Sequence, residues 1–239
     1  MVPILLYGHP LGSSMGLVAA FEWLGQPYRL CGVKMPDDML TPAYTTLNGR
    51  RETPVLIDGD GHVVTETLAI ALWLEARDAE RRISFPPGSA EADRLHQMLA
   101  FLNTGFTAAF SPYWAAFEMA DPDPDYQAAL RRFGQGAVAK RHRQLEAMIG
   151  ETRFLLGPRP TLADAVFAGV ARWADFHQAI DPAAYPRITG LKARLQDEPA
   201  IRFALAVEDG AELAGSGAAQ GRVPLAEALA LASPQAAPA

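Results

Sequence analysis

The sequence ETPVLI at residues 52–57 ends a loop in an apolar strand, and TETLAI at residues 65–70 then opens a helix. A proline immediately before a buried strand is unusual, because proline supplies no amide donor to a sheet ladder. A tight turn at Pro54 suits a cis peptide bond, which turns Thr53 so that its backbone amide and carbonyl face outward. An extended peptide could then pair with these two groups, as an added strand would.

The start of the following helix offers polar groups to the other end of such a peptide. Thr65, Glu66 and Thr67 place two hydroxyls and a carboxylate there. The two segments together predict a site for a small peptide that carries both an amine and a carboxylate. The alternative is local helix capping, in which a threonine bonds to the backbone and Glu66 only favours the helix dipole. The adjacent Pro54 favours the binding interpretation.

This combination resembles the glutathione S-transferases, whose thioredoxin-like domain carries a cis-proline loop followed by an acidic and hydroxyl pair that holds the γ-glutamyl end of glutathione. Other segments resemble the family in the same order: ILLYG at 4–8, the helix at 15–25, QPY at 26–28 and TPAYTTLN at 41–48. The C-terminal half is similar to the bacterial beta class at FLNTGF (101–106), FSPYW (110–114) and TLAD (161–164). The resemblance spans roughly residues 4 to 210.

The resemblance implies an α/β N-terminal thioredoxin-like domain followed by an all-α C-terminal helical-bundle domain. Short apolar runs alternate with helical patterns up to about residue 78, and DGDG at 58–61 indicates a hairpin. A charged segment with Pro-Pro-Gly follows, and apolar residues then recur at steps of three and four. We predict a thioredoxin-like glutathione-binding domain at 1–78, a linker at 79–90, an all-helical domain with the electrophile pocket at 91–213, and an Ala/Pro-rich, partly disordered tail at 214–239, with one short helix around 224–231.

Composition narrows the possible functions. A net charge of -6 over 239 residues argues against a nucleic-acid or anionic-membrane surface. The single cysteine, Cys31, excludes an internal disulfide framework and is compatible with a reducing cytosol. No apolar run approaches the roughly 20 residues that span a bilayer, and the N-terminus starts a strand pattern without a basic leader. These features predict a cytoplasmic protein.

The resemblance also implies a function. Members bind glutathione as a co-substrate, need no metal, act in detoxification, and form homodimers in which the first domain packs on the partner's second domain. Thr53, Pro54, Glu66 and Thr67 are the expected glutathione-binding residues, and the thiolate would be transferred to a small hydrophobic electrophile. The same thiolate can drive isomerisation, dehalogenation or ether cleavage. Glu52 replaces a frequent glutamine, and we expect it to point elsewhere or to pair with Arg50 or Arg51.

The sequence departs from the beta-class pattern at the catalytic positions. Counted without gaps from EWLG at 22–25, the catalytic cysteine of that class falls on Gly12, and its histidine and lysine fall on Thr107 and Ala108. The nearest hydroxyls are Ser13 and Ser14, and serine serves this role in other classes of the family. Either could donate a hydrogen bond to the thiolate at the start of the first helix. Alternatively, both only cap that helix.

Four further residues are candidates for the electrophile pocket: His9, Phe110, Tyr113 and Trp114. The alternatives are that the aromatic residues form plain core and that the loop histidine lies on the surface. Thr161 and Asp164 have the spacing of a capping box and should serve folding. Because the beta-class functional side chains are missing, a second hypothesis is a non-catalytic ligand-binding or protein-interaction module. A working thiolate donor near Ser13 and Ser14 would separate the two hypotheses.

Overall fold

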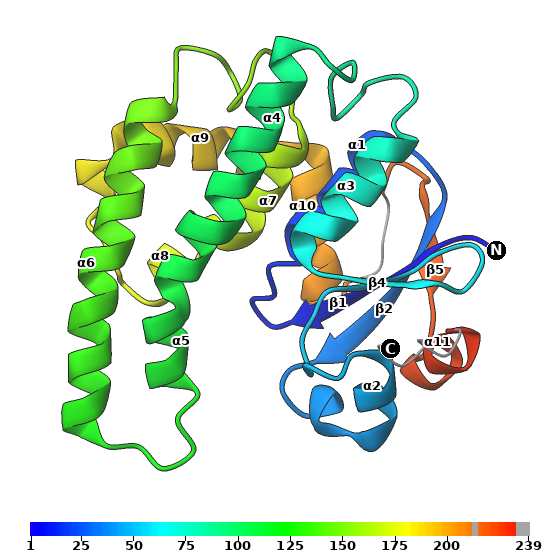
Figure 1. The fold of residues 1–239 in the computed structure, drawn as a ribbon, viewed down its shortest axis with the longest axis horizontal. Coiled ribbons are helices and arrows are strands. Elements are labelled where there is room, and N and C mark those ends of the chain that lie inside the picture. The colour runs from blue at the N-terminus through cyan, green and yellow to red at the C-terminus, as the bar shows by residue number, and fades with distance from the viewer. Residues whose placement is uncertain (212–214, 233–239) are drawn as a thin grey trace.

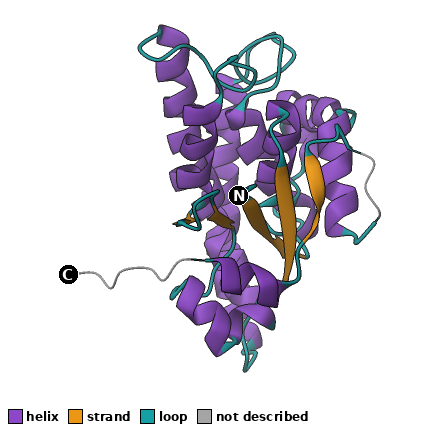
Figure 2. Ribbon diagram, turned by 90° about the vertical axis from the view of Figure 1, so that its right-hand side faces the viewer, coloured by secondary structure: helices purple, strands orange, loops and turns teal. Residues whose placement is uncertain are grey.

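The computed structural model describes residues 1–211 and 215–232 and has two parts (Figure 1). The first part alternates strands and helices, as the short apolar runs predict. Its elements are β1 (Ile4–His9), α1 (Met15–Leu24), β2 (Tyr28–Lys34), a 3₁₀ turn (Asp38–Leu40), α2 (Pro42–Leu47), β3 (Val55–Ile57), β4 (Val63–Thr65) and α3 (Thr67–Arg77). Figure 2 shows the strands gathered within this part of the molecule, with helices around them.

The sheet has the order β4-β3-β1-β2-β5. β1 pairs in parallel with β2 and antiparallel with β3, so Leu5 lies between Leu30 and Leu56. Alternate residues face opposite sides: Leu5, Leu30 and Leu56 join the core beneath α1 and α3, whereas Ile4 and Cys31 pack with α2 and the C-terminal segment. Both faces are therefore covered, which explains why these strands are almost continuously apolar. Together with the helical second part, this arrangement confirms the predicted order of an α/β domain followed by an all-α domain.

The second part is helical. It contains α4 (Ala90–Ala100), a π-helical segment (Phe101–Thr107), a 3₁₀ turn (Ala108–Phe110), α5 (Ser111–Phe117), α6 (Pro124–Met148), α7 (Leu162–Ala171), α8 (Trp173–Phe176), a 3₁₀ turn (Pro182–Ala184), α9 (Pro186–Gln196) and α10 (Pro199–Glu208). Among the helices described, none is long and apolar enough to cross a membrane.

The two parts meet along α1, which packs against α7 and α10. The backbones approach closely there: a side chain at Gly16 would run into the Ala165 carbonyl, and one at Gly169 would run into the Ser13 carbonyl. Glycine is thus required at both positions so that the start of α1 can lie directly against the helical part. This contact places the β1–α1 loop at the junction of the two parts.

The C-terminal tail contributes more structure than the sequence predicts. The expected short helix is present as α11 (Leu225–Leu231), but β5 (Ala219–Arg222) also pairs in parallel with β2 and forms one edge of the sheet. Val223 and Ala228 are buried against the face of the sheet that carries α2. The segment Ala-Gln-Gly-Arg lacks the branched and aromatic residues typical of strands, so its backbone pairing, and not its side chains, makes it a strand. Residue 214 and residues 233–239 of the predicted, partly disordered tail lie outside the described residues.

Candidate functional site

A cleft of about 690 Å³ lies between the two parts of the molecule. The sheet side contributes residues from the β1–α1 loop, the α2–β3 loop and the start of α3. The helical side contributes residues from the π-helical segment through α5 and from α8. The lining residues are Ser13, Asn48, Arg50, Glu52, Thr53, Pro54, Glu66, Thr67, Asn103, Thr107, Ala108, Ser111, Trp114, Ala115, Glu118 and Trp173. All four residues predicted to bind glutathione therefore line one cleft.

The turn at Pro54 has the predicted form, since the Thr53–Pro54 peptide bond is cis. β3 begins just after it, where Val55 pairs with Thr65 of β4. Among the residues that the structure describes, the Thr53 backbone amide and carbonyl have no hydrogen-bond partner. Thr53 lines the cleft next to Glu66 and Thr67 at the start of α3.

Glu66 has an uncommon backbone conformation at the start of α3, with φ 73° and ψ 128°. A side chain other than glycine rarely adopts a positive φ, and such residues cluster at ligand sites. The Glu66 carboxylate makes no capping hydrogen bond to α3. Instead its Oε1 atom pairs with Arg50 Nη2 at 2.6 Å, and Arg50 Nε pairs with Glu52 at 3.2 Å. The expected pairing of Glu52 with Arg50 is confirmed, and the Glu66 side chain does not cap α3.

The two candidate serines occupy different environments. Ser14 is completely buried, and its Oγ accepts a hydrogen bond from the Gly8 amide at 2.9 Å. Ser13 is half-buried and lines the cleft at the start of α1. Neither hydroxyl caps α1 through a side-chain bond in the described structure. The geometry favours Ser13 over Ser14 as a group that reaches a ligand.

Gly12, where the beta-class cysteine falls in an ungapped count, leaves no room for a side chain. A Cβ atom there would collide with the Gly8 carbonyl. A cysteine at position 12 could not be accommodated by this loop conformation. Thr107 and Ala108, where the histidine and lysine of that class fall, do line the cleft. Positions 107 and 108 therefore lie at the cleft, but neither carries an ionisable side chain.

Of the four residues predicted for the electrophile pocket, one, Trp114, lines the cleft. Phe110 is fully buried edge-on to Trp173, with ring centroids 5.7 Å apart, and Tyr113 is buried against Gly134 of α6. The His9 ring lies beside the Tyr7 ring, with centroids 5.9 Å apart, and His9 does not line the cleft. The π-helical segment and the 3₁₀ turn before α5 rotate the helix face, so regular helical spacing could not identify which side chains point into the cleft.

Sequence reasoning missed several lining residues of the helical wall. No sequence motif marks these residues, which are Asn103, Ser111, Glu118 and Trp173. They are recognised as lining residues from their position at the junction of the two parts. Within the described chain, the Glu118 carboxylate makes no ion pair or hydrogen bond, and partial burial raises its pKa. The buried Trp114 Nε1 likewise has no hydrogen-bond partner among the residues described. The helical wall therefore carries aromatic rings, one unpaired acid and one unused donor.

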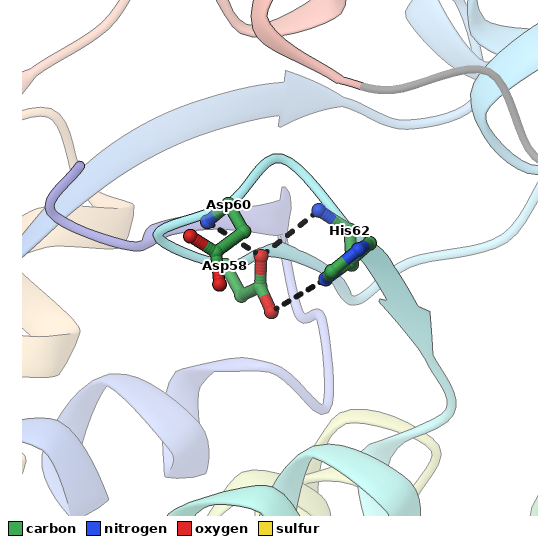
Figure 3. Close-up of side chains that lie close together, drawn as sticks. All are labelled: Asp58, Asp60 and His62. Atoms are coloured by element: carbon green, nitrogen blue, oxygen red, sulfur yellow. Dashed lines mark hydrogen bonds and ion pairs between the residues drawn. The ribbon is translucent and has the colours of Figure 1, made fainter.

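A separate group of ionisable side chains lies in the β3–β4 hairpin, away from the cleft. Figure 3 shows Asp58, Asp60 and His62 close together. Asp58 Oδ1 accepts the backbone amides of Asp60 and His62, both at 2.9 Å, and Asp58 Oδ2 lies 3.3 Å from His62 Nδ1. These contacts close the turn that the DGDG sequence predicts, and they account for the grouping.

Comparisons with known proteins give the family that the chain is similar to. The family model described as "Glutathione S-transferase, N-terminal domain" matches residues 14–77, and "Glutathione S-transferase, C-terminal domain" matches residues 127–190. The chain is 24% identical over 209 residues to glutathione S-transferase GstA of Escherichia coli O157:H7, covering 85% of this chain and 98% of that protein.

Solved structures are similar over the same extent. A glutathione transferase from Methylococcus capsulatus strain Bath superposes with a TM-score of 0.76 at 26% identity, covering 87% of this chain and 99% of that one. A sphingomonad glutathione S-transferase complexed with glutathione has a TM-score of 0.74 at 22% identity, covering 86% and 98%.

Proposed function

The chain belongs to the glutathione S-transferase family, and we propose that it binds glutathione in the cleft, activates the thiol, and transfers it to a small hydrophobic electrophile. One observation carries the proposal. The unpaired Thr53 backbone, the acidic and hydroxyl pair Glu66–Thr67, and Ser13 at the start of α1 all line the same cleft. Glutathione is a small peptide with an amine, carboxylates and a thiol, so each group meets matching chemistry.

Binding uses the sheet side of the cleft. The Thr53 amide and carbonyl pair with the backbone of the ligand, as an added strand would. The Glu66 carboxylate accepts the γ-glutamyl amine, and the Thr67 hydroxyl donates to the carboxylate beside that amine. Hydrogen bonds to charged groups are stronger than neutral ones, contributing about 1.5–3 kcal/mol each. Holding the γ-glutamyl end in this way directs the thiol toward α1.

Activation uses Ser13 and the positive end of α1. A free thiol titrates near ~8.5, so little thiolate is present at neutral pH. A hydroxyl donating to the sulfur favours the charged form by about 1.5–3 kcal/mol, which lowers the thiol pKa by roughly one to two pH units. The helix dipole acts in the same direction. The electrophile then lies against the helical wall, on Trp114 and Trp173.

Ser13→Ala should therefore raise the pKa of the bound thiol by about one to two pH units and slow turnover near neutral pH by about 10–100-fold. Ser14→Ala is the matched control. It removes the buried acceptor of the Gly8 amide, so it should lower stability by about 1–3 kcal/mol and leave the thiol pKa unchanged. Ultraviolet absorbance of the bound thiolate across pH measures this. An unchanged pKa in Ser13→Ala would show that Ser13 is not the donor.

The acid on the helical wall should influence which electrophiles react. Glu118→Gln is expected to raise kcat/KM for a carboxylated aromatic electrophile by about 2–5-fold relative to an uncharged analogue, because exposed charges interact by up to about 1 kcal/mol. Partial burial raises the pKa of Glu118. In the native protein, lowering the pH should therefore neutralise Glu118 and raise the ratio of kcat/KM for the carboxylated analogue to kcat/KM for the uncharged one. Glu151→Gln, at an exposed site outside the cleft, is the control. If Glu118→Gln and Glu151→Gln give the same ratio of kcat/KM for the two electrophiles, Glu118 does not influence which electrophile reacts.

A second function is favoured by one observation. Gly12, Thr107 and Ala108 occupy the positions of the beta-class catalytic side chains, which is what a non-catalytic ligand-binding or interaction module would show. Such a module would bind glutathione without lowering its thiol pKa.

Other parts of the proposal rest on the family alone. We propose a homodimer in which the first domain packs on the partner's second domain, and a detoxifying role in the cytoplasm. Glutathione is then the co-substrate, and isomerisation, dehalogenation or ether cleavage could proceed from the same thiolate. Sedimentation of the purified protein tests the dimer directly.

A further inference from the structure

The β1–α1 loop is held from the helical part by three side chains, and the function above gives no role to two of them, Arg172 and Glu208. The three are Arg172, between α7 and α8, Trp173, the first residue of α8, and Glu208, the last residue of α10. α10 runs beside α1 (Figure 1). We call these three residues the loop clamp.

Arg172 and Glu208 form a bidentate ion pair that hydrogen-bonds to both backbone groups of one loop residue, Gly12. Arg172 Nη1 donates to Glu208 Oε2, and Arg172 Nη2 donates to Glu208 Oε1 at 2.8 Å. Glu208 Oε1 also accepts the Gly12 amide at 3.1 Å, and Arg172 Nη2 donates to the Gly12 carbonyl at 2.8 Å. The side chains of Arg172 and Glu208 are only 17% and 7% exposed, so the pair is shielded from water and its geometry is fixed.

The residue before Gly12 is held as well. Trp173 Nε1 donates to the Leu11 carbonyl at 2.8 Å, and Leu11 has a φ of 61°, in the left-handed region that favours glycine. A residue with such a backbone persists only where the surroundings over-determine it. The loop clamp supplies that constraint, because it bonds to Leu11 and to both backbone groups of Gly12.

We propose that Arg172 and Glu208 are positioning residues for the thiolate donor; this inference rests on the proposed function. The Gly12 carbonyl and the Ser13 amide belong to one planar peptide unit, in which they point in opposite directions. The bond from Arg172 to the Gly12 carbonyl therefore fixes the direction of the Ser13 amide, and the bond from Glu208 to the Gly12 amide fixes the preceding unit. Together they orient Ser13 toward the sulfur of glutathione.

Two conservative substitutions test this. Arg172→Lys keeps the charge but loses the fork, and Glu208→Gln keeps an acceptor for Gly12 but loses the ion pair. Glu198→Gln is the matched control, since Glu198 pairs with Arg153 at 2.9 Å elsewhere in the helical part. Circular dichroism first confirms that each variant is folded. If Glu208→Gln does not fold, Arg172→Lys carries the test alone, because it leaves Glu208 with a cationic neighbour.

The first readout is amide hydrogen exchange of the peptide at 8–16 without ligand. We expect exchange about tenfold faster in both clamp variants and unchanged in the control. The second readout is glutathione binding. The pKa of the bound thiol should rise by about one pH unit, while Kd changes by less than about threefold because Thr53, Glu66 and Thr67 are untouched.

The outcomes separate the two proposals. Unchanged exchange in the folded clamp variants would overturn the loop clamp. Faster exchange with an unchanged thiol pKa would overturn its positioning role. If the native protein itself fails to lower the thiol pKa, the proposed function and the positioning role both fall, whereas the exchange data alone still decide whether Arg172 and Glu208 hold the loop.

Discussion

Replacing Glu66 and Thr67 together with alanine should weaken glutathione binding by about 10²–10⁴-fold. In the proposed complex these side chains make the two charge-assisted bonds to the γ-glutamyl end, each contributing about 1.5–3 kcal/mol. Every 1.4 kcal/mol changes the affinity about tenfold. Calorimetric titration of the double variant and the native protein measures the difference. Unchanged affinity would show that the γ-glutamyl end is not bound here.

Two further variants separate binding from folding. Thr65 accepts a bond from Arg50 at 2.9 Å but does not line the cleft, so Thr65→Ala should change the affinity by less than about threefold. Glu66 has a φ of 73°, a conformation that glycine adopts without steric cost. Glu66→Gly should therefore keep or raise the thermal stability while it still loses affinity. A Glu66→Gly variant that is both unstable and weakly binding would indicate a structural role for the side chain.

Asp164→Ala should destabilise the protein by about 3–5 kcal/mol, because it leaves buried donors without an acceptor. Asp164 is fully buried and accepts the Leu155 amide and both the amide and hydroxyl of Thr161, each at 2.9 Å. For a chain of this size the melting midpoint should fall by about 6–20 °C. Asp181→Ala removes an exposed cap of one 3₁₀ turn and should cost about 1 kcal/mol or less. Similar melting points for the two variants would contradict this assignment.

The same carboxyl should make stability depend on pH. Burial raises the pKa of Asp164 to about 6, above the value of about 3.9 in an unfolded chain. The folded state therefore binds an extra proton between these two values. The resulting stabilisation is complete below the unfolded pKa and is lost as pH rises through about 6, by up to about 3 kcal/mol. Denaturant unfolding measures the free energy of unfolding across this pH range. That free energy should change less with pH in Asp164→Asn than in the native protein, and an equal change in both would show that Asp164 is not the titrating group.

Local signals in the sequence predicted the sheet side of the cleft. The cis bond at Pro54 and the polar start of α3 depend on residues adjacent in the chain, so their geometry could be inferred without knowing the fold. The same holds for the capping box of Thr161 and Asp164, which is present as predicted. In each case turn and cap chemistry acts over at most a few residues.

The helical side of the cleft could not be predicted in this way. Phe110 and Tyr113 point into the core because a π-helical segment and then a 3₁₀ turn precede α5. These segments have a different number of residues per turn from an α-helix, so they change which residues face the cleft. Ser14 is buried and bonded to Gly8 of the preceding strand, whereas Ser13 lines the cleft. The loop clamp joins residues about 160 to 196 positions apart. Such contacts depend on tertiary packing, which residue spacing does not encode.

We propose above all that this cleft binds glutathione and lowers the pKa of its thiol. The most direct measurement is a calorimetric titration with glutathione, combined with ultraviolet absorbance of the bound thiolate across pH. We expect saturable binding and a bound thiol pKa at least about one pH unit below the free value near ~8.5. Binding with an unshifted pKa would contradict catalysis and favour the ligand-binding module, and an absence of binding would contradict the site itself.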